Sequence, residues 1–396
     1  MPSRGSAAFD VIVVGLGAMG AAATWQLALT GAHTLGLDRF DPPHMRGSTH
    51  GDTRITRLAI GEGSQYVPLV QRSHRLWRAI EAETGHSLLH ITGGLIVGLT
   101  ASSGSGAMGF QQSTAAIAQR FGIAHEDLGG AELGRRFPQF AFTPNEVGYY
   151  EPSAGYVRPE ADVAAQLQLA GKYGADLRTG ERVLGFEAVD GHLRVSTDRG
   201  TYLAAKLVLT TGPWVSEFLP EYHDLFRVFR QVLYWFDLKE PDTYELYHRM
   251  PIFIWEVDGS QGLGLYGFPA IDGPRGGLKL ATEQYLVSTS ADQPQAPVDD
   301  AEIAAMHRSL VADRLPGLSA RCVKAVTCLY TVTPDHGFVI DRHPGHDNVI
   351  VASPCSGRGF KHSAAIGEIL AQLATRGNSD LDISQFSFDR PTLHKG

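Results

Sequence analysis

The feature that most constrains this chain is a glycine-rich segment at residues 15–20, GLGAMG, which fits the pattern G-x-G-x-x-G. A β-branched apolar run, FDVIVVG, precedes it and predicts a fully buried parallel strand. An alanine-rich run, AAATWQLALTG, follows and predicts a helix that ends at Gly31. In this setting the first glycine permits a tight turn, the second lets the backbone approach a pyrophosphate, and the third lets helix and strand pack closely. Gly15, Gly17 and Gly20 therefore predict a dinucleotide site at a helix N-terminus, where free N–H groups favour anions.

The identity of the dinucleotide depends on later segments. Asp38 ends a second predicted strand, TLGLD, where a carboxylate can bind a ribose hydroxyl of either NAD or FAD. TYLAAKLVLTTGPW predicts a strand that leads into Thr211 and Gly212, and NVIVASPCSGRGFKHSAAIGE predicts another strand that leads through glycines into a helix. These extra backbone donors suit a flavin, whose ring and ribityl chain must be held far from the ADP half.

Composition excludes several classes of function. The 396 residues suggest two domains, and 43% hydrophobic with 19% charged residues predicts a soluble globular protein with a sizeable core. A net charge of -8 without a run of Lys or Arg argues against nucleic-acid binding, so an anionic ligand needs a local cationic pocket. The apolar stretch near the start is too short to span a bilayer, so we expect neither a secretion signal nor a membrane anchor. The 3 cysteines indicate a reducing compartment, which we take as the cytoplasm, and the 16 histidines show no metal-binding spacing.

Strands and helices interleave without a repeat of fixed period, which predicts an α/β fold class, α+β overall. The segment at 64–85 places Val67, Val70, Trp77 and Ile80 at helical spacing, as in a helix with a core-facing stripe. From about residue 218 to residue 290 the chain is aromatic and strand-like, which predicts a second, sheet-based domain. Its large aromatic side chains are expected in the core, namely Trp235, Phe253 and Trp255.

Six segments together resemble the monomeric sarcosine oxidase and N-methyltryptophan oxidase family. They are, in chain order, FDVIVVGLGAMGAAATWQLA, FDPPHMRGSTHGDTRITR, YGFP, GLKL, CLYTVTPDHGFVID and SGRGFKHSAAIGE. The resemblance implies a monomeric FAD enzyme that oxidises the C–N bond of a secondary amino acid to an imine, which hydrolyses, while O2 is reduced to H2O2. It also implies a Rossmann-like FAD-binding domain and a mixed-sheet substrate domain. We place the first at residues 1–90, 150–217 and 326–396 and the second at residues 91–149 and 218–325.

The resemblance assigns a substrate clamp to two residues. In HGDTRITR, Thr53 and Arg54 would lie near the flavin, and Arg57 would bind the substrate carboxylate. Lys361 of SGRGFK would be the second carboxylate partner. A guanidinium and an ammonium group are natural partners for a carboxylate, and they would orient the C–N bond against the flavin.

The resemblance also assigns Tyr266 of YGFP to the substrate cavity and Lys279 of GLKL to the flavin face at which oxygen is reduced. Cys328 of CLYT would carry a covalent bond to the flavin; the alternative is an inert buried thiol. The cofactor contacts that we expect are Gly15, Gly17, Gly20, Asp38, Ser48, His50, Thr53, Arg54, Val183, Gly212, Cys328, Gly357, Gly359 and Lys361.

The chain departs from the family at several positions near the substrate. Glu283 stands four residues after Lys279, where sarcosine oxidases carry a histidine, and Arg358 replaces a histidine in the glycine-rich loop. Pro354 and Cys355 precede that loop where Gly-Phe is expected. A carboxylate in place of an imidazole changes charge and steric demand, so we place Glu283 among the catalytic residues and leave the substrate open. N-methyltryptophan is one candidate among several larger or cationic amines.

Plainer interpretations of the same residues are kept as alternatives. Arg54 and Arg57 also fit a solvated helical face paired with Asp52 or Glu62, and Lys279 fits an edge strand with its ammonium group in water. At the level of function, the alternatives are an FAD dehydrogenase that passes electrons to a partner and a flavin-binding protein without catalysis.

Overall fold

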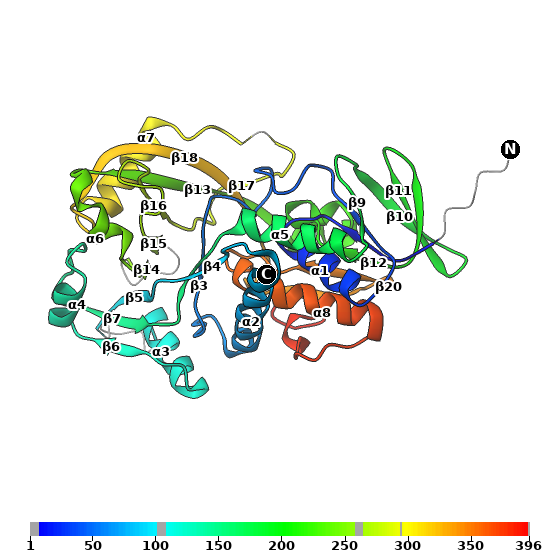
Figure 1. Cartoon of the computed structure of the whole chain (residues 1–396), viewed down its shortest axis with the longest axis horizontal. Helices are drawn as coiled ribbons and strands as arrows, with labels where there is room; N and C mark the ends of the chain where they lie inside the picture. Colours follow the sequence, from blue (N-terminus) through cyan, green and yellow to red (C-terminus); the bar gives the residue numbers. More distant parts are fainter. Residues whose placement is uncertain (1–7, 101–107, 258–263, 294, 395–396) are drawn as a thin grey trace.

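The computed structural model describes residues 8–100, 108–257, 264–293 and 295–394, in which two large sheets lie side by side (Figure 1). The first has 8 strands, and its parallel strands form its centre. They are β1 (Phe9–Val14), β2 (Thr34–Leu37), β9 (Asp176–Arg178), β12 (Thr201–Leu209) and β20 (His346–Ser353). Antiparallel strands extend it, namely β10 (Val183–Val189), β11 (His192–Thr197) and β19 (Val339–His343).

Helix α1 (Ala18–Leu29) packs against α5 (Pro159–Lys172) and α8 (Ser363–Arg376). It ends as the sequence predicts, because Gly31 has a φ of 83°, a left-handed conformation that favours glycine. Helix α2 (Val67–Thr84) lies against α8 with the predicted apolar stripe buried. Strands far apart in sequence thus lie beside the strand and helix at the start of the chain. The predicted α/β fold class is confirmed.

The second sheet has 9 strands. Residues before 152 supply β5 (Gly94–Leu99), β6 (Glu126–Leu128) and β7 (Glu146–Glu151). Later residues supply β13 (Arg227–Leu238), β14 (Ile252–Trp255), β15 (Leu265–Gly267), β16 (Leu278–Ala281), β17 (Ser288–Thr289) and β18 (Leu318–Val332). The sheet is mixed, since β14 pairs parallel with β5 and its other pairs are antiparallel. The helices of this region are α3 (Phe110–Phe121), α4 (Gly130–Arg136), α6 (Tyr244–His248) and α7 (Asp300–Met306). Trp235, Phe253 and Trp255 are buried, which confirms their expected place in the core.

A third sheet of 3 short strands, β3 (Arg54–Thr56), β8 (Gly155–Val157) and β4 (Leu89–Ile91), completes the strand inventory. The long strand β18 pairs with β13 from residue 318 to residue 332 and so crosses the domain boundary expected at 325/326. The domain boundaries stay a prediction. None of the helices in the described ranges has both the length and the apolar character that a membrane crossing requires.

Candidate active site

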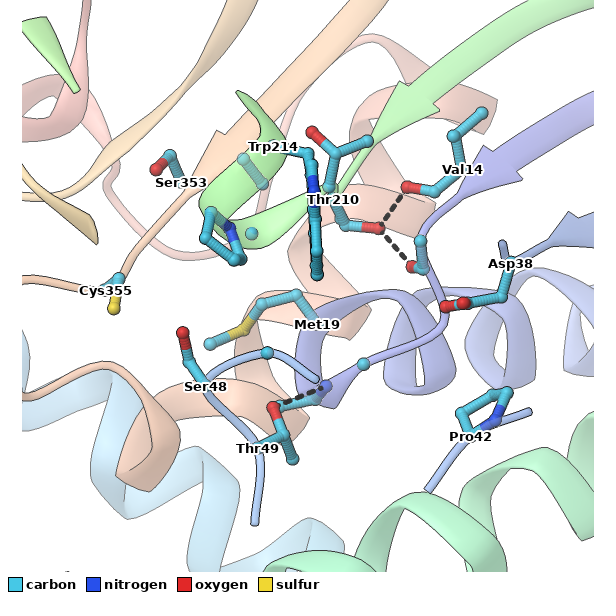
Figure 2. Close-up of a pocket in the computed structure, with 18 of the residues that line it drawn as sticks. Val14, Met19, Asp38, Pro42, Ser48, Thr49, Thr210, Trp214, Ser353 and Cys355 are labelled. Atoms are coloured by element: carbon cyan, nitrogen blue, oxygen red, sulfur yellow. Dashed lines mark hydrogen bonds between the residues drawn. The ribbon is translucent and has the colours of Figure 1, made fainter. Parts of the chain in front are cut away.

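A cavity runs along the carboxyl ends of β1, β2 and β12 to the turn after β20 (Figure 2). Asp38 lies toward one end of it and Cys355 toward the other. The predicted cofactor contacts that line it are Gly15, Gly17, Asp38, Ser48, Arg54, Val183, Gly212, Gly357 and Gly359. The other predicted contacts are not part of this lining, namely Gly20, His50, Thr53, Cys328 and Lys361.

A side chain at each glycine of the glycine-rich turn would meet different surroundings. Gly15 has a φ of +88°, and a Cβ there would lie 2.6 Å from the carbonyl oxygen of Thr210. A Cβ on Gly20 would overlap the carbonyl oxygen of Gly15, so the helix could not pack against the turn. At Gly17 an added Cβ would meet only Thr49 Oγ1, at 3.6 Å, so this glycine leaves open space beside the cavity. Because Gly17 also provides no side-chain cap for α1, an anion here would face the helix N-terminus.

Asp38 both fixes this turn and lines the cavity. Its Oδ2 accepts a hydrogen bond from the Leu16 N–H at 2.7 Å, and its Oδ1 accepts one from the Phe40 N–H at 2.8 Å. A carboxylate held by two backbone donors has a defined position, as recognition of a ribose requires.

The cavity mouth beside Asp38 joins the two sheets through residues that the sequence did not single out. The Arg39 guanidinium lies 4.9 Å from the ring centre of Trp214. Asp292, from the segment after β17, accepts a hydrogen bond from Trp214 Nε1 at 2.8 Å and lies 3.3 Å from Arg39. The segment after β17, which belongs to the second sheet, thus covers the edge of a cavity that is built on the first sheet.

Lys279 is buried, with 3% of its surface exposed, and it points at the segment before β3. Its Nζ donates to the carbonyl oxygens of Gly51, at 2.5 Å, and Thr53, at 2.8 Å. The ring of Phe268 lies 4.5 Å from the same nitrogen. Burial, and then the charge of Arg54, hold the pKa of Lys279 well below its usual range. The interpretation of Lys279 as an edge-strand lysine in water is therefore wrong, since β16 lies between β13 and β15.

Arg57 and Lys361, the residues expected to bind the substrate carboxylate, lie in a buried charge cluster that includes Glu62. Arg57 is 2% exposed, and its Nη2 lies 2.7 Å from Glu62 Oε2. Lys361 Nζ donates to the carbonyl oxygen of Arg358 at 3.0 Å. Burial lowers the pKa of Lys361 to about 8, although Glu62 opposes the shift. Burial alone would raise the pKa of Glu62, but Arg57, Lys361 and Arg358 hold it well below its usual range.

The helical-face interpretation of Arg57 is wrong, although its partner is the proposed Glu62. Arg57 follows the short strand β3 and is enclosed, with its guanidinium 5.1 Å from the ring centre of Phe110. Arg54 lies within β3 itself, not on a helix, and its Nη2 donates to the carbonyl oxygen of Ser48 at 2.9 Å.

Cys328 lies on β18 and is 2% exposed. Its Sγ lies 3.6 Å from Arg54 Nη2. Burial raises the pKa of the Cys328 thiol, and the charges of Arg54 and Lys279 act in the opposite direction. Cys355, which replaces a residue of the expected Gly-Phe pair, lines the cavity.

Glu283 lies against the turn that follows β20. A Cβ on Gly357 would be 2.8 Å from Glu283 Oε1 and 2.8 Å from Tyr330 Cε2, so glycine is required where these two side chains converge. The hydroxyl groups of Tyr266 and Tyr330 are 3.3 Å apart. Tyr285 donates a hydrogen bond to Glu283 Oε2 at 2.8 Å. Burial raises the pKa of Glu283.

Tyr330, which also lines the cavity, was not predicted, although it lies two residues after Cys328 in the same motif.

Residues 10–373 match the model of a family described as FAD dependent oxidoreductase. The chain belongs to this family. It is 41% identical to monomeric sarcosine oxidase of Streptomyces avermitilis over 385 residues, which cover 96% of this chain and 97% of that protein. It is 33% identical to N-methyl-L-tryptophan oxidase of Yersinia pestis over 387 residues, or 96% of this chain and 99% of that protein. The open form of NikD, described as an unusual amino acid oxidase, superposes with a TM-score of 0.81 at 25% identity, covering 96% of this chain and 98% of NikD.

In this FAD-dependent oxidoreductase the cavity has polar groups suited to the cofactor. Within the described ranges, Ser48 Oγ, Thr211 Oγ1 and both ring nitrogens of His50 are buried without a hydrogen-bond partner. Ser48 and Thr211 line the cavity, and His50 lies in the same segment as Ser48. Burial, and then the charge of Arg54, lower the pKa of His50 to about 3, so its imidazole is neutral and has one donor and one acceptor. Buried polar atoms of this kind require a partner, which FAD can supply.

Proposed function

We propose that this chain oxidises the C–N bond of a secondary amino acid, N-methyl or cyclic, to an imine, and that O2 is reduced to H2O2. The observation that carries the proposal is the buried pair of cations, Arg57 and Lys361. A carboxylate site is the role that they would have in an oxidase like the relatives, which are named for sarcosine and N-methyl-L-tryptophan. Glu62 neutralises only one of these two cations, and an excess buried cation is costly in a protein interior unless it binds a further anion. The imine then hydrolyses to an amine and a carbonyl product.

FAD would lie along the whole cavity. Its pyrophosphate would face Gly15, Gly17 and the start of α1, and its ribose would face Asp38. Its ring would reach the turn containing Gly357, near Arg54. When bound, the flavin supplies the electron acceptor for the amine and then passes the electrons to oxygen.

The residues of this chain would bind and orient the substrate. Among the residues that the structure describes, Lys361 donates to only one backbone oxygen, so its ammonium group has capacity for a carboxylate. Arg57 already pairs with Glu62, which therefore sets the orientation of the guanidinium and competes with the substrate for it. Tyr266 and Tyr330 would form the wall beside the reacting carbon.

Two further roles are part of the proposal. Lys279 would provide the positive charge at the flavin face where oxygen is reduced, because its charge is buried and held by uncharged oxygens. Cys328 would form a thioether with a ring methyl group of the flavin: the S–H bond and one methyl C–H bond would break, an S–C bond would form, and O2 would take up the two electrons released through the flavin. Arg54, 3.6 Å from the sulfur, opposes the effect of burial and so favours the thiolate. A monomeric state and a cytoplasmic location stay predictions from the sequence.

Anaerobic mixing with a panel of N-methyl and cyclic amino acids tests the proposal. At least one of them should bleach the visible absorbance of the flavin, and admission of air should restore it with one H2O2 for each substrate. Bleaching without peroxide under air would indicate a dehydrogenase with a partner acceptor. Absence of bleaching by the whole panel would contradict the proposed function.

A further inference from the structure

Glu283 places a carboxylate at the end of the cavity remote from Asp38. It follows β16 by two residues and contacts Gly357, which lines the cavity. Gly357 has a φ of +77° and no side chain, so the Glu283 carboxylate approaches the cavity wall beside the ring of Tyr330. Glu283 is thus a neighbour of the space in which the amine would be oxidised.

One oxygen of this carboxylate has no protein partner. Oε2 accepts the hydrogen bond from Tyr285, whereas no donor within the described ranges bonds to Oε1. No Lys or Arg of that part of the chain lies within ion-pair distance of Glu283, although Arg358 is only one residue after Gly357. The free oxygen of this half-buried carboxylate is therefore available to a ligand that provides a donor.

The charges around Glu283 are arranged with opposite signs on two sides. Arg57 and Glu62 neutralise each other, which leaves Lys361 and Arg358 as the positive side. Glu283 forms the negative side. The charged and titratable groups that act on Glu283 or are acted on by it are Tyr285, Arg358, Glu62, Lys361, Tyr266 and Tyr330. This pattern is complementary to a molecule with a carboxylate at one end and a cation at the other.

We propose that Glu283 pairs with the ammonium group of a zwitterionic amino acid and accepts its proton before the C–N bond is oxidised. The inference rests on the proposed function and defines its substrate class as amino acids that bind in the zwitterionic form. In the proton transfer, the N–H bond of the ammonium breaks and an O–H bond forms at Glu283 Oε1, without change of oxidation state. The nitrogen lone pair that is freed can then form the imine double bond as hydrogen leaves the neighbouring carbon.

The need for such an acceptor follows from the chemistry of amines. An alkyl amine has a pKa of about 10, so at neutral pH nearly all of the substrate arrives protonated. A protonated nitrogen has no lone pair for an imine. Burial of Glu283 raises its pKa, which brings it closer to that of the amine and makes it a better proton acceptor.

The first test compares Glu283→Gln with the wild type by anaerobic flavin reduction across pH. At neutral pH the variant should reduce its flavin at least about 100-fold more slowly. The difference should shrink to within about threefold as the pH rises past about 10, because the free amine then arrives without the proton. Glu245→Gln, an exposed change of the same kind, should leave the profile unchanged. Superimposable profiles for Glu283→Gln and wild type would overturn the inference.

A second test measures binding alone and needs no oxidation. Dimethylsulfonioacetate carries a permanent positive charge beside its carboxylate, and methylthioacetate has a similar skeleton without that charge. The wild type should bind the sulfonium compound about tenfold more tightly, and Glu283→Gln should lose the preference, because one charge-assisted contact is removed. No preference in the wild type, or no binding of either compound, would overturn the inference. If the amino-acid panel fails to bleach the flavin while this preference is found, the proposed oxidation is wrong but the charge pairing stands.

Tyr285→Phe keeps the inference testable if Glu283→Gln does not retain flavin. Loss of the hydrogen bond to the carboxylate raises the pKa of Glu283 further. The acidic limb of the flavin-reduction profile should therefore move to higher pH, with the rate at its plateau retained. An unmoved limb would contradict the role of Glu283.

Discussion

Replacement of Lys279 by Met should separate the two halves of the catalytic cycle. The change keeps most of the side-chain volume and removes a positive charge that is buried and bonded to the carbonyl oxygens of Gly51 and Thr53. Substrate binding and flavin reduction should persist, since the expected carboxylate ligands are Arg57 and Lys361. The reaction of the reduced flavin with oxygen should slow, because negative charge develops on oxygen there.

The size of this effect follows from the surroundings of the ammonium group. No carboxylate within the described residues forms an ion pair with Lys279, and the adjacent Asp52 pairs with Lys324 at 2.6 Å. Below the pKa of Lys279, its charge therefore acts on the reaction without a paired carboxylate. Two opposite unit charges about 5 Å apart at an effective dielectric constant of about 20 attract by about 3 kcal/mol, or roughly 100-fold in rate. Gly51 and Thr53 also lose a buried donor, which should lower the free energy of unfolding by about 1–3 kcal/mol.

Stopped-flow mixing of reduced enzyme with oxygen measures the predicted change directly. Lys239→Met is a matched control, because Lys239 is exposed and its Nζ donates to the carbonyl oxygen of Pro316, away from Lys279 and Asp52. It should reoxidise at the wild-type rate. The pKa of Lys279 is lowered, so its charge is present below that pKa and is lost as the pH rises through it. Wild-type reoxidation should slow over that pH range, whereas Lys279→Met should show no such step. Reoxidation of Lys279→Met at the wild-type rate would refute the reasoning.

Further predictions concern the clamp, the flavin bond and the cavity mouth. Arg57→Ala or Lys361→Ala should raise KM about 10- to 100-fold, since each charge-assisted bond contributes roughly 1.5–3 kcal/mol; unchanged kinetics in both would contradict the clamp. After acid precipitation and proteolysis, mass spectrometry should find flavin on the peptide that contains Cys328, and full release of free FAD would show the attachment to be wrong. In a Cys328→Ser background, Asp292→Ala should make FAD dissociate several-fold faster during dialysis, because Trp214 at the cavity mouth loses its hydrogen bond to Asp292. An equal rate of FAD loss would exclude a role of Asp292 in retaining FAD.

Local patterns predicted the parts of the fold that depend on nearby residues. The glycine-rich turn, the end of α1 at Gly31 and the buried stripe of α2 each depend on steric or periodic rules within one segment. The sheet-based second region was predicted from its aromatic, strand-like composition. The burial of Lys279 was not decided by the sequence, because GLKL does not reveal that β16 lies between two other strands.

The residues that sequence reasoning missed are brought to the site by tertiary structure. Asp292 reaches Trp214 across 78 positions of the chain, and no local pattern marks either residue. Glu62 was considered only as a partner on a surface, whereas it is the central anion of a buried cluster. Tyr330 had an available signal, since strand periodicity places it on the same side of β18 as Cys328.

The order of strands in the first sheet has a consequence for synthesis on the ribosome. β1 pairs with β12, and β12 pairs with β20, so the centre of this sheet joins segments that emerge early, midway and late. Helix α8, which packs against α1, emerges later still. The nascent chain consequently holds its first βα unit without its final neighbours while more than 300 residues are translated. Such late closure leaves apolar surface open to chaperones, and stable retention of FAD begins only after translation has passed β20.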